Sequence, residues 1–258
     1  MKSENKVALI TGSSTGVGAA TGLNLASEGW NVVINYSKSK KEAEQTAAAC
    51  SNFGIDVMVC KANVAEDEQC KNMVRDAVAK WGRIDALVNN AGTTKFCSYD
   101  DLDGLTKDDF LNLYAVNVVS AYQMSRAAKP YLEDAEDGAI VNTSSISAIS
   151  GVGSSIAYAA SKGALSTLTL SLAHALAPGI RVNAVCPGFI QGRWTKGFLG
   201  ERYEEVKKSI EKRTLLNKTS LPEDVANAIV FLIQKADMLT GQLLTIDGGG
   251  LINQSKLG

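Results

Sequence analysis

The stretch Val7-Ala8-Leu9-Ile10-Thr11-Gly12-Ser13-Ser14-Thr15-Gly16-Val17-Gly18 joins an apolar run to a segment with helical periodicity over residues 17–28. Glycines permit a tight turn between strand and helix. They also let backbone N–H groups approach an anion at the helix N-terminus, where the helix dipole favours negative charge. Such a turn can be purely structural, but its position directly between a strand and a helix favours a dinucleotide site. The residues predicted to hold the dinucleotide here are Gly12, Ser14, Thr15, Gly16, Val17 and Gly18.

Seven apolar runs of four to six residues recur along the chain, and segments of helix length separate them. The runs are rich in β-branched residues and nearly continuous, as expected for strands buried on both faces of a parallel sheet. They are VALI from Val7, NVVIN from Asn31, VMVC from Val57, ALVNN from Ala86, AIVNTS from Ala139, RVNAVC from Arg181 and LLTI from Leu243. The predicted helices cover residues 17–28, 40–53, 67–81, 106–131, 157–177 and 222–234.

This alternation allows a closed β/α barrel or a doubly wound sheet, and the glycine-rich turn after the first strand favours the wound sheet. We therefore expect an α/β fold with one Rossmann-type parallel sheet of about seven strands and helices on both faces. Because open α/β sheets often reach roughly 250 residues as one unit, residues 1–258 are predicted to form a single domain. The longest irregular region, between Pro187 and Ser220, mixes glycine with aromatic residues, so residues 189–220 are predicted to be a substrate lid.

The composition argues against several classes of partner. The net charge is -1 and the pI is about 6.0, so the chain has no global positive field for nucleic acid or an anionic membrane. No stretch approaches the roughly 20 apolar residues of a membrane span, and the N-terminus lacks the apolar core of a signal peptide. The five cysteines are scattered without a CxxC pair, which indicates free thiols. We expect a cytoplasmic protein that binds neither nucleic acid nor membrane.

His174 is the only histidine in the chain and lies in an apolar helical run. A Ser-His-Asp hydrolase needs a catalytic histidine beside an acid, and a histidine-rich metal site cannot be built from one imidazole. We expect no metal site, and a packing or capping role for His174.

Tyr158 and Lys162 stand four residues apart on a predicted helix, about one turn or 6 Å along its axis. A nearby ammonium stabilises phenolate, which would lower the tyrosine pKa from about 10 towards the working pH of a proton donor. Ser145 follows a strand, at the carboxyl edge where wound sheets bind ligands, and its hydroxyl can hold a carbonyl oxygen. Such a tyrosine and lysine also occur by chance, and serines after strands are often only turn residues.

The end of the second strand predicts which dinucleotide binds. NAD-type sites usually place Asp or Glu there to hold the ribose 2′-hydroxyl, whereas this chain has no carboxylate between Glu28 and Glu42. Tyr36, Ser37 and Lys38 stand there instead, and hydroxyl and ammonium groups can bind a 2′-phosphate. NADP(H) is therefore favoured over NAD(H), the alternative being a solvated basic start to the next helix.

Taken together, TGSSTGVG from Thr11, NNAG from Asn89, SS at Ser144 with YAASK from Tyr158, and PG from Pro187 resemble the short-chain dehydrogenase/reductase superfamily. The resemblance runs in order from Lys6 to Gly250. It implies that Tyr158 is the general acid/base, that Lys162 lowers its pKa and binds the nicotinamide ribose, and that Ser145 orients the carbonyl. It also implies that Asn117 supports a proton-relay water. Further cofactor contacts implied by the resemblance are Asn63, Val64, Asn90, Ala91, Gly92, Pro187, Gly188 and Ile190.

The resemblance implies hydride transfer between nicotinamide and a carbonyl or secondary alcohol. VVINYS, PEDVA and LTIDGG are most similar to 3-oxoacyl-[acyl-carrier-protein] reductases and their sugar-dehydrogenase relatives, so a 3-oxoacyl thioester or small ketone is the expected substrate. Only three residues separate Tyr158 from Lys162, whereas enoyl reductases typically have a longer gap. A sugar or polyol dehydrogenase shares these catalytic residues and stays an alternative. A catalytically silent dinucleotide sensor also stays possible, although the intact set argues against it.

Three positions depart from the family pattern. Asn63 stands where an aspartate often touches adenine, Thr15 replaces a basic residue of many NADP-specific members, and Gly192 stands where a threonine commonly meets the carboxamide. Thr195 would substitute for that threonine only if the loop shifted. Family members are usually homotetramers built on the helices that contain Asn117 and Tyr158. The small residues Ala159, Ala160, Gly163 and Ala164 would permit close helix approach at such an interface.

Overall fold

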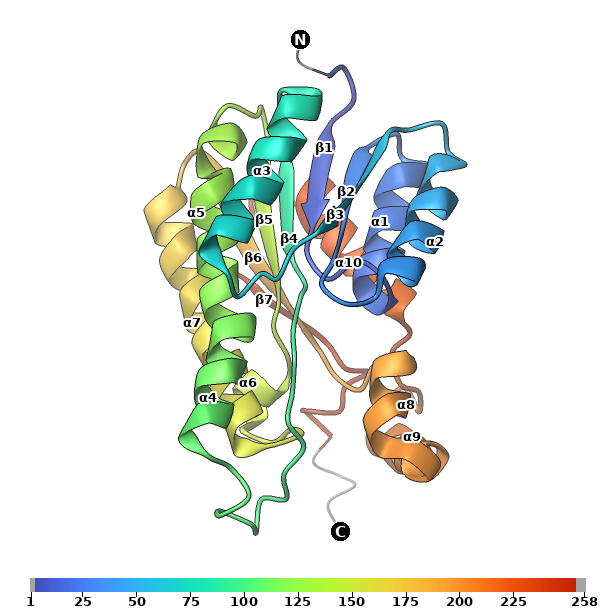
Figure 1. Cartoon of the computed structure of the whole chain (residues 1–258). Coiled ribbons are helices and arrows are strands. Elements are labelled where there is room, and N and C mark those ends of the chain that lie inside the picture. Colours follow the sequence, from blue (N-terminus) through green and yellow to red (C-terminus); the bar gives the residue numbers. More distant parts are fainter. Residues whose placement is uncertain (1–2, 254–258) are drawn as a thin grey trace.

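Seven parallel strands form one sheet in the computed structural model, which describes residues 3–253 (Figure 1). The spatial order is β3-β2-β1-β4-β5-β6-β7, so the chain changes direction across the sheet between β1 and β4. In a wound sheet, ligands bind beyond the carboxyl ends of the strands at this point. The strands are β1 Val7–Ile10, β2 Asn31–Tyr36, β3 Val57–Lys61, β4 Ala86–Asn89, β5 Gly138–Thr143, β6 Ile180–Pro187 and β7 Leu243–Ile246.

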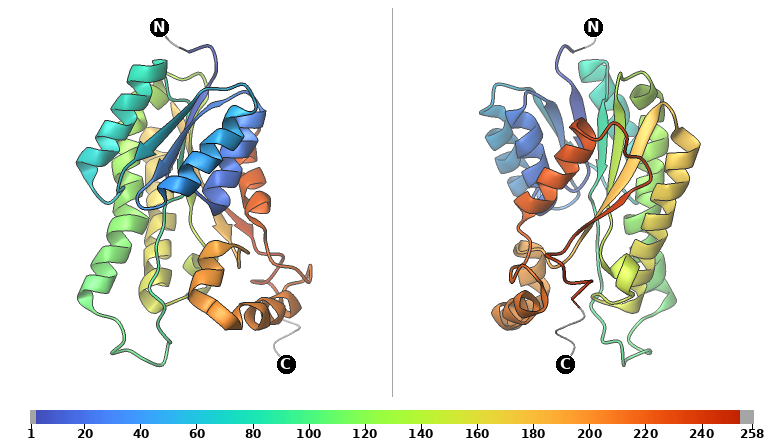
Figure 2. Two further views of the ribbon diagram at one scale, coloured as in Figure 1. Left: turned by 45° about the vertical axis from the view of Figure 1, so that its right-hand side comes forward. Right: turned by 180° about the vertical axis from the view of Figure 1, so that it is seen from behind.

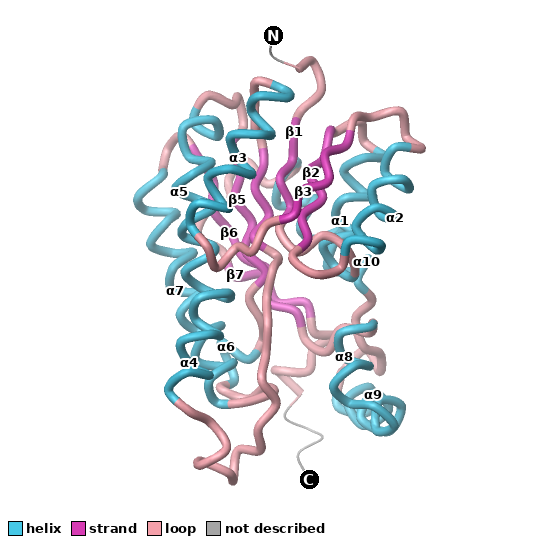
Figure 3. Tube along the Cα trace, viewed as in Figure 1, coloured by secondary structure: helices cyan, strands magenta, loops and turns pink. Residues whose placement is uncertain are grey.

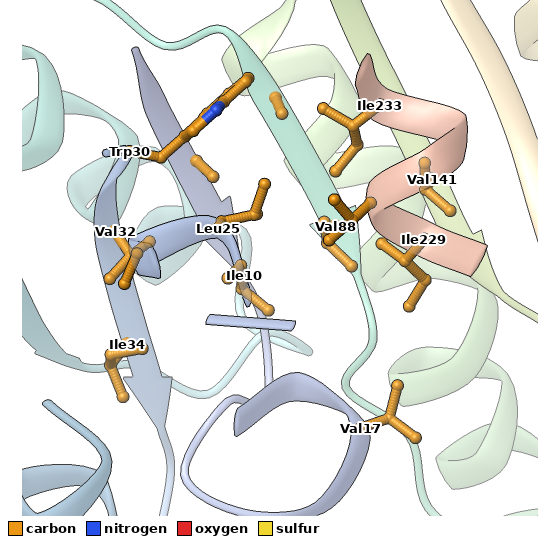
Figure 4. Close-up of a cluster of buried hydrophobic side chains, with 14 of the residues drawn as sticks. Ile10, Val17, Leu25, Trp30, Val32, Ile34, Val88, Val141, Ile229 and Ile233 are labelled. Atoms are coloured by element: carbon orange, nitrogen blue, oxygen red, sulfur yellow. The ribbon is translucent and has the colours of Figure 1, made fainter. Parts of the chain in front are cut away.

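Helices cover both faces of the sheet (Figure 2), which confirms the predicted doubly wound α/β class. One face carries α1 Gly16–Ser27, α2 Lys40–Ser51 and α10 Pro222–Gln234, and the other carries α3 Asp67–Trp81, α5 Ser120–Glu133 and α7 Ile156–Leu176. A hydrophobic core lies under each set of helices, the first under α1, α2 and α10 and the second under α3, α5 and α7. Along β1, Ala8 and Ile10 belong to the first core, whereas Val7 and Leu9 belong to the second. Because both faces are buried, the strands contain continuous apolar runs. Figure 4 shows the first core, where Leu25 and Ile229 approach the strands from the helix side.

The predicted lid is more regular than its glycine content indicates (Figure 3). It contains α8 Arg193–Leu199, the short 3-10 helix η2 Gly200–Arg202 and α9 Tyr203–Arg213. The expectation of an irregular segment was wrong because α9 carries Glu204 and Glu205 in its first turn and Lys212 and Arg213 in its last. Acidic residues at the start and basic residues at the end stabilise a helix through its dipole.

The predicted helix over residues 106–131 is also interrupted. It divides into α4 Lys107–Tyr114, a π-helical segment η1 Ala115–Val119, and α5. Short π-helical segments within α-helices are frequent at functional sites, and η1 contains Asn117. At the start of α4, Thr106 and Asp109 form a capping box. At the start of α10 the Asp224 carboxylate accepts from the Leu221 N–H at 2.8 Å.

The structure also bears on His174, on the cysteines and on the question of membrane and metal sites. His174 is exposed in the last turn of α7, so the predicted packing role is wrong, although its place suits the helix dipole. All five cysteines are free. Within residues 3–253 no helix has both the length and the apolar character needed to cross a membrane. The same residues contain no cluster of histidine, cysteine or carboxylate side chains that could hold a metal ion.

Candidate active site

The glycine-rich turn after β1 is braced by Asn35, near the end of β2. The Gly12 N–H donates to Asn35 Oδ1 at 2.9 Å, and the Ser13 N–H donates to the Asn35 backbone oxygen at 3.0 Å. In return, the Asn35 N–H donates to Ser13 Oγ at 2.8 Å. The sequence prediction omitted Asn35. The sequence signal for Asn35 was an amide side chain near the end of a strand rich in β-branched residues, because a buried polar group needs partners.

Asn90, just after β4, holds the same turn from the other side. Its Nδ2 donates to the carbonyl oxygens of Thr11 at 3.0 Å and Gly12 at 3.1 Å. A Cβ added at Gly18 would lie 2.6 Å from Asn90 Nδ2 and 2.7 Å from the Gly12 oxygen, so this contact requires glycine. Asn90 thus contacts the glycine-rich turn directly, and its role toward the cofactor stays a prediction.

The outer side of the turn suits a pyrophosphate. Gly16 has a φ of +61°, and a Cβ added there would meet nothing within 4 Å. Among residues 3–253, no capping hydrogen bond reaches the Thr15 side chain at the start of α1. The first N–H groups of that 12-residue helix can therefore bind an anion, as helix N-termini do. The turn fits a nicotinamide dinucleotide, with Ser14 and Val17 in the same segment.

The residues predicted to bind the adenosine part of the dinucleotide follow β2 and β3. Tyr36 is buried at the end of β2, whereas Ser37 and Lys38 are exposed. Asn63 is exposed, and its Oδ1 accepts from the Ala65 N–H at 3.2 Å. Val64 beside it is buried. The structure thus places two polar groups and one ammonium on exposed segments that follow the neighbouring strands β2 and β3.

Arg193, from the lid, reaches this corner. Its Nη2 donates to Ser39 Oγ at 3.1 Å, and its Nη1 forms an ion pair with Glu42. The sequence prediction missed Arg193 because the partners are 154 and 151 positions away along the chain. The contact places a guanidinium beside the segment that was predicted to bind the 2′-phosphate.

Ser145 and Tyr158 meet at the carboxyl edge of β5. Ser145 is buried, and its Oγ accepts from the Ser147 N–H at 3.1 Å. Tyr158 lies in the first turn of α7, where its N–H donates to the N-cap Ser155 Oγ at 3.2 Å. Burial raises the pKa of Tyr158 to about 12, and a hydrogen bond to Ser145 acts in the opposite direction. The phenol therefore stays protonated near neutral pH.

Lys162 lies one turn further along α7 and is buried. Its Nζ donates to the Thr143 oxygen at 2.8 Å and lies 5.7 Å from the centre of the Tyr158 ring. Burial lowers the pKa of Lys162 to about 8, so the amine is still largely charged at neutral pH. We expected Lys162 to bring the pKa of Tyr158 below its ordinary value. In the structure the direction is the opposite, because burial of the phenol outweighs its polar contacts.

Asn117 is buried in η1 and is tied to two segments. Its Nδ2 donates to the Thr93 oxygen and to Ser161 Oγ, both at 3.0 Å, and its Oδ1 accepts from the Thr93 N–H at 2.8 Å. A Cβ at Gly92 would lie 3.5 Å from Asn117 Oδ1 and 3.6 Å from Lys162 Nζ. Gly92 therefore lies between these two side chains, and Ala91 just before it donates its N–H to Thr11 Oγ1 at 3.0 Å.

The end of β6 supplies the remaining predicted cofactor residues. The Ile146 N–H donates to the Pro187 oxygen at 3.0 Å, and the Gly188 N–H donates to the Ile246 oxygen at 2.9 Å. Ile190 pairs with Ser220 at the base of the lid. Thr195, the suggested substitute contact for the carboxamide, instead donates its hydroxyl to the Ile190 oxygen at 2.9 Å. Its side chain stabilises the lid from within.

The comparisons with known proteins agree with this geometry. A family model described as enoyl-(acyl carrier protein) reductase matches residues 12–250. A Streptomyces violaceoruber protein, named as a candidate ketoacyl reductase of the granaticin polyketide synthase, is 39% identical over 246 residues, covering 95% of this chain and 96% of its own. The 3-oxoacyl-[acyl-carrier-protein] reductase FabG of Staphylococcus aureus strain Mu50 is 35% identical over 246 residues, covering 95% of this chain and 97% of its own.

Two solved structures are similar along nearly the whole chain. A Burkholderia xenovorans structure, described as a candidate short-chain dehydrogenase/reductase, has a TM-score of 0.91 and 38% identity, covering 97% of this chain and 100% of its own. NAD+-bound xylitol dehydrogenase has a TM-score of 0.86 and 28% identity, covering 95% and 98%. The fold and the comparisons define a nicotinamide-dependent oxidoreductase. Within that class the chain belongs to the short-chain dehydrogenase/reductase family, whose members act on ketone and alcohol groups.

Proposed function

We propose that this protein reduces a ketone to a secondary alcohol with NADPH, and that the ketone is a 3-oxoacyl thioester or a small ketone of similar size. The observation that carries the proposal is the arrangement around Tyr158, whose hydroxyl is in reach of buried Ser145 and whose ring centre lies 5.7 Å from Lys162 Nζ. In this proposal the hydroxyls of Ser145 and Tyr158 act on one carbonyl oxygen, and Lys162 acts on Tyr158. The ketoacyl reductase names of two relatives support the choice of substrate.

When bound, the reduced nicotinamide supplies the hydride for the carbonyl carbon. Ser145 donates a hydrogen bond to the carbonyl oxygen and orients it, and Tyr158 gives its phenolic proton to the same oxygen as negative charge develops there. Lys162, held by the Thr143 oxygen, stabilises the phenolate that remains and binds the nicotinamide ribose. Asn117 fixes the backbone at Thr93 and supports the water through which the proton of Tyr158 is restored.

The glycine-rich turn would hold the pyrophosphate, with the neighbouring segments holding the rest of the cofactor. In this proposal residues 1–258 act as one domain, and residues 189–220 cover the substrate. The five free thiols and the small net charge of -1 support a role in the reducing cytoplasm, without nucleic acid or membrane as partner.

The direct test is turnover of NADPH with a panel of ketones, 3-oxoacyl thioesters, an enoyl thioester and polyols. We expect NADPH oxidation with the oxo compounds and none above background with the enoyl thioester. Reduction of only the enoyl thioester would overturn the proposal and agree with the family model's description.

The alternative of an NAD-linked polyol dehydrogenase is favoured by the xylitol dehydrogenase neighbour. It predicts oxidation of polyols with NAD+ and little ketone reduction.

The preference for NADP(H) is tested at Ser37, which is exposed at the end of β2. A carboxylate there repels a 2′-phosphate and can accept from a ribose hydroxyl. We expect Ser37→Asp to weaken NADPH binding at least tenfold and to strengthen NADH binding, both measured by fluorescence titration. Ser37→Asn, which has a similar size and no charge, is the matched control and should change NADPH affinity less. Tighter binding of NADH than NADPH by tenfold in the unmodified protein would contradict the preference.

Assembly is tested on the outer side of α4, α5 and α7. Leu111, Tyr122 and Leu170 expose apolar side chains there, and a Cβ added at Gly163 on α7 would meet nothing within 4 Å of the same chain. We propose that this face packs against other subunits in a homotetramer. Leu111→Glu should then lower the mass measured by light scattering, whereas Met238→Glu, at an exposed site after α10, should not. A mass of about 27.3 kDa for the unmodified protein at micromolar concentration would refute the assembly.

A further inference from the structure

Three aromatic side chains form a row that begins at Tyr158. The Tyr158 and Trp194 ring centres are 6.4 Å apart. Trp194 and Phe198 meet edge to face at 5.1 Å, and Phe198 stacks on Phe96 at 6.3 Å. We call Trp194, Phe198 and Phe96 the aromatic row. Two of its members come from α8 in the lid and one comes from the segment after β4, so the row joins the lid to the opposite loop.

The aromatic row is not part of either hydrophobic core. Trp194 is 51% exposed and Phe96 is 57% exposed, whereas the other tryptophans, Trp30 and Trp81, are 6% and 4% exposed. A further exposed apolar side chain lies near the reacting tyrosine. Val152 is 65% exposed, and a Cβ added to its neighbour Gly153 would lie 3.1 Å from Tyr158 Cδ1. Exposed apolar groups gathered around a reacting group indicate a binding surface.

Several polar side chains close in sequence to Phe96 and Val152 are already partnered. Thr94 and Ser154 hydrogen-bond to each other through their hydroxyls. The Tyr99 hydroxyl donates to the Gly151 oxygen at 2.9 Å and accepts from the Gly153 N–H at 2.8 Å. A polyol needs free donors and acceptors around it, whereas the side chains closest to Tyr158 in this set are the Trp194 ring and the segment that carries Val152.

Resting on the proposed carbonyl reduction, we propose that the aromatic row selects ketones that carry an aryl or flat conjugated group next to the reacting carbonyl. The ring of such a substrate would pack against Trp194 while its oxygen lies at Tyr158 and Ser145. The short distance between the Tyr158 and Trp194 rings places that group within a bond or two of the carbonyl. Aromatic side chains favour offset or edge-to-face partners at this range.

The test compares acetophenone with 2-octanone, which have the same number of carbon atoms. An aromatic pair contributes the equivalent of about twofold to tenfold beyond burial of area. Trp194→Ala should therefore lower kcat/KM for acetophenone by about tenfold once lost area is included, and lower it for 2-octanone by a clearly smaller factor. Trp194→Phe should restore most of the acetophenone activity. Phe53→Ala removes a side chain that is also 51% exposed, at a site after α2, and should change neither substrate.

Equal losses on both ketones in Trp194→Ala would overturn the inference and leave the row as packing that closes the lid. Calorimetric titration with the alcohols 1-phenylethanol and 2-octanol gives a readout that does not depend on turnover. We expect the ratio of their dissociation constants to shift against 1-phenylethanol in Trp194→Ala. If the unmodified protein reduced no ketone, the proposed function would fail. An unchanged ratio in the titration would overturn the aromatic selectivity by itself.

Discussion

Replacing Tyr158 by phenylalanine is expected to lower kcat by about 10² to 10⁴, the range that general acid catalysis supplies. The variant keeps the ring that contacts Trp194 and loses only the hydroxyl that gives the proton. NADPH should bind with nearly unchanged affinity, because the turn that would hold its phosphates is braced by Asn35 and Asn90. Turnover and binding therefore separate, and this is measured by steady-state kinetics beside fluorescence titration of NADPH.

One further variant sharpens that result. Tyr99→Phe removes the phenol that anchors the Gly151 and Gly153 backbone and serves as the matched control. It should weaken substrate binding more than kcat. A Tyr158→Phe variant that kept more than a tenth of the original turnover would show that another group donates the proton. The silent-sensor alternative would instead give no turnover in the unmodified protein.

The strand pattern and the glycine-rich turn were predictable from the sequence because both are local. Val7 to Ile10 is buried on both faces, so its apolar run is continuous, and Gly12 and Gly16 have the positive φ that their turn requires. The family motifs likewise located the four proposed catalytic residues. The structure then brought Ser145, Tyr158 and Lys162 together, with Asn117 connected through Gly92.

Contacts between distant segments could not be predicted in this way. Arg193 reaches Ser39 across 154 positions, and its partner is set by how the lid folds. The aromatic row depends on the same event, because Phe96 meets Phe198 only when the lid lies against the loop after β4. The direction of the Tyr158 pKa was also missed, since burial is a property of the packed site and has no signature in the spacing of Tyr158 and Lys162.

Replacing Lys162 by methionine is expected to affect activity and stability in opposite directions. Without the ammonium, Tyr158 loses the charge that stabilises its phenolate, and the nicotinamide ribose loses a contact, so both turnover and NADPH affinity should fall. Burial of the charge already lowers the pKa of Lys162 from 10.5 to about 8, which costs folding free energy at neutral pH. Methionine has a similar length and no charge, although it leaves the Thr143 oxygen without the Lys162 donor. We expect a net gain of about 1 to 2 kcal/mol in unfolding free energy.

The pH dependence identifies the origin of that gain. Below about pH 8, Lys162 is protonated in both the folded and unfolded states, so its burial cost is fully present. As the pH rises from about 8 to 10.5, the folded state releases the proton before the unfolded state does, and the original protein gains stability relative to the variant. Urea unfolding of both proteins at several pH values should show the advantage of Lys162→Met fading over this interval. Lys235→Met, at an exposed site, should show no such trend. A variant that is less stable than the original protein at pH 7 would mean that the Lys162 contact with Thr143 outweighs the burial of its charge.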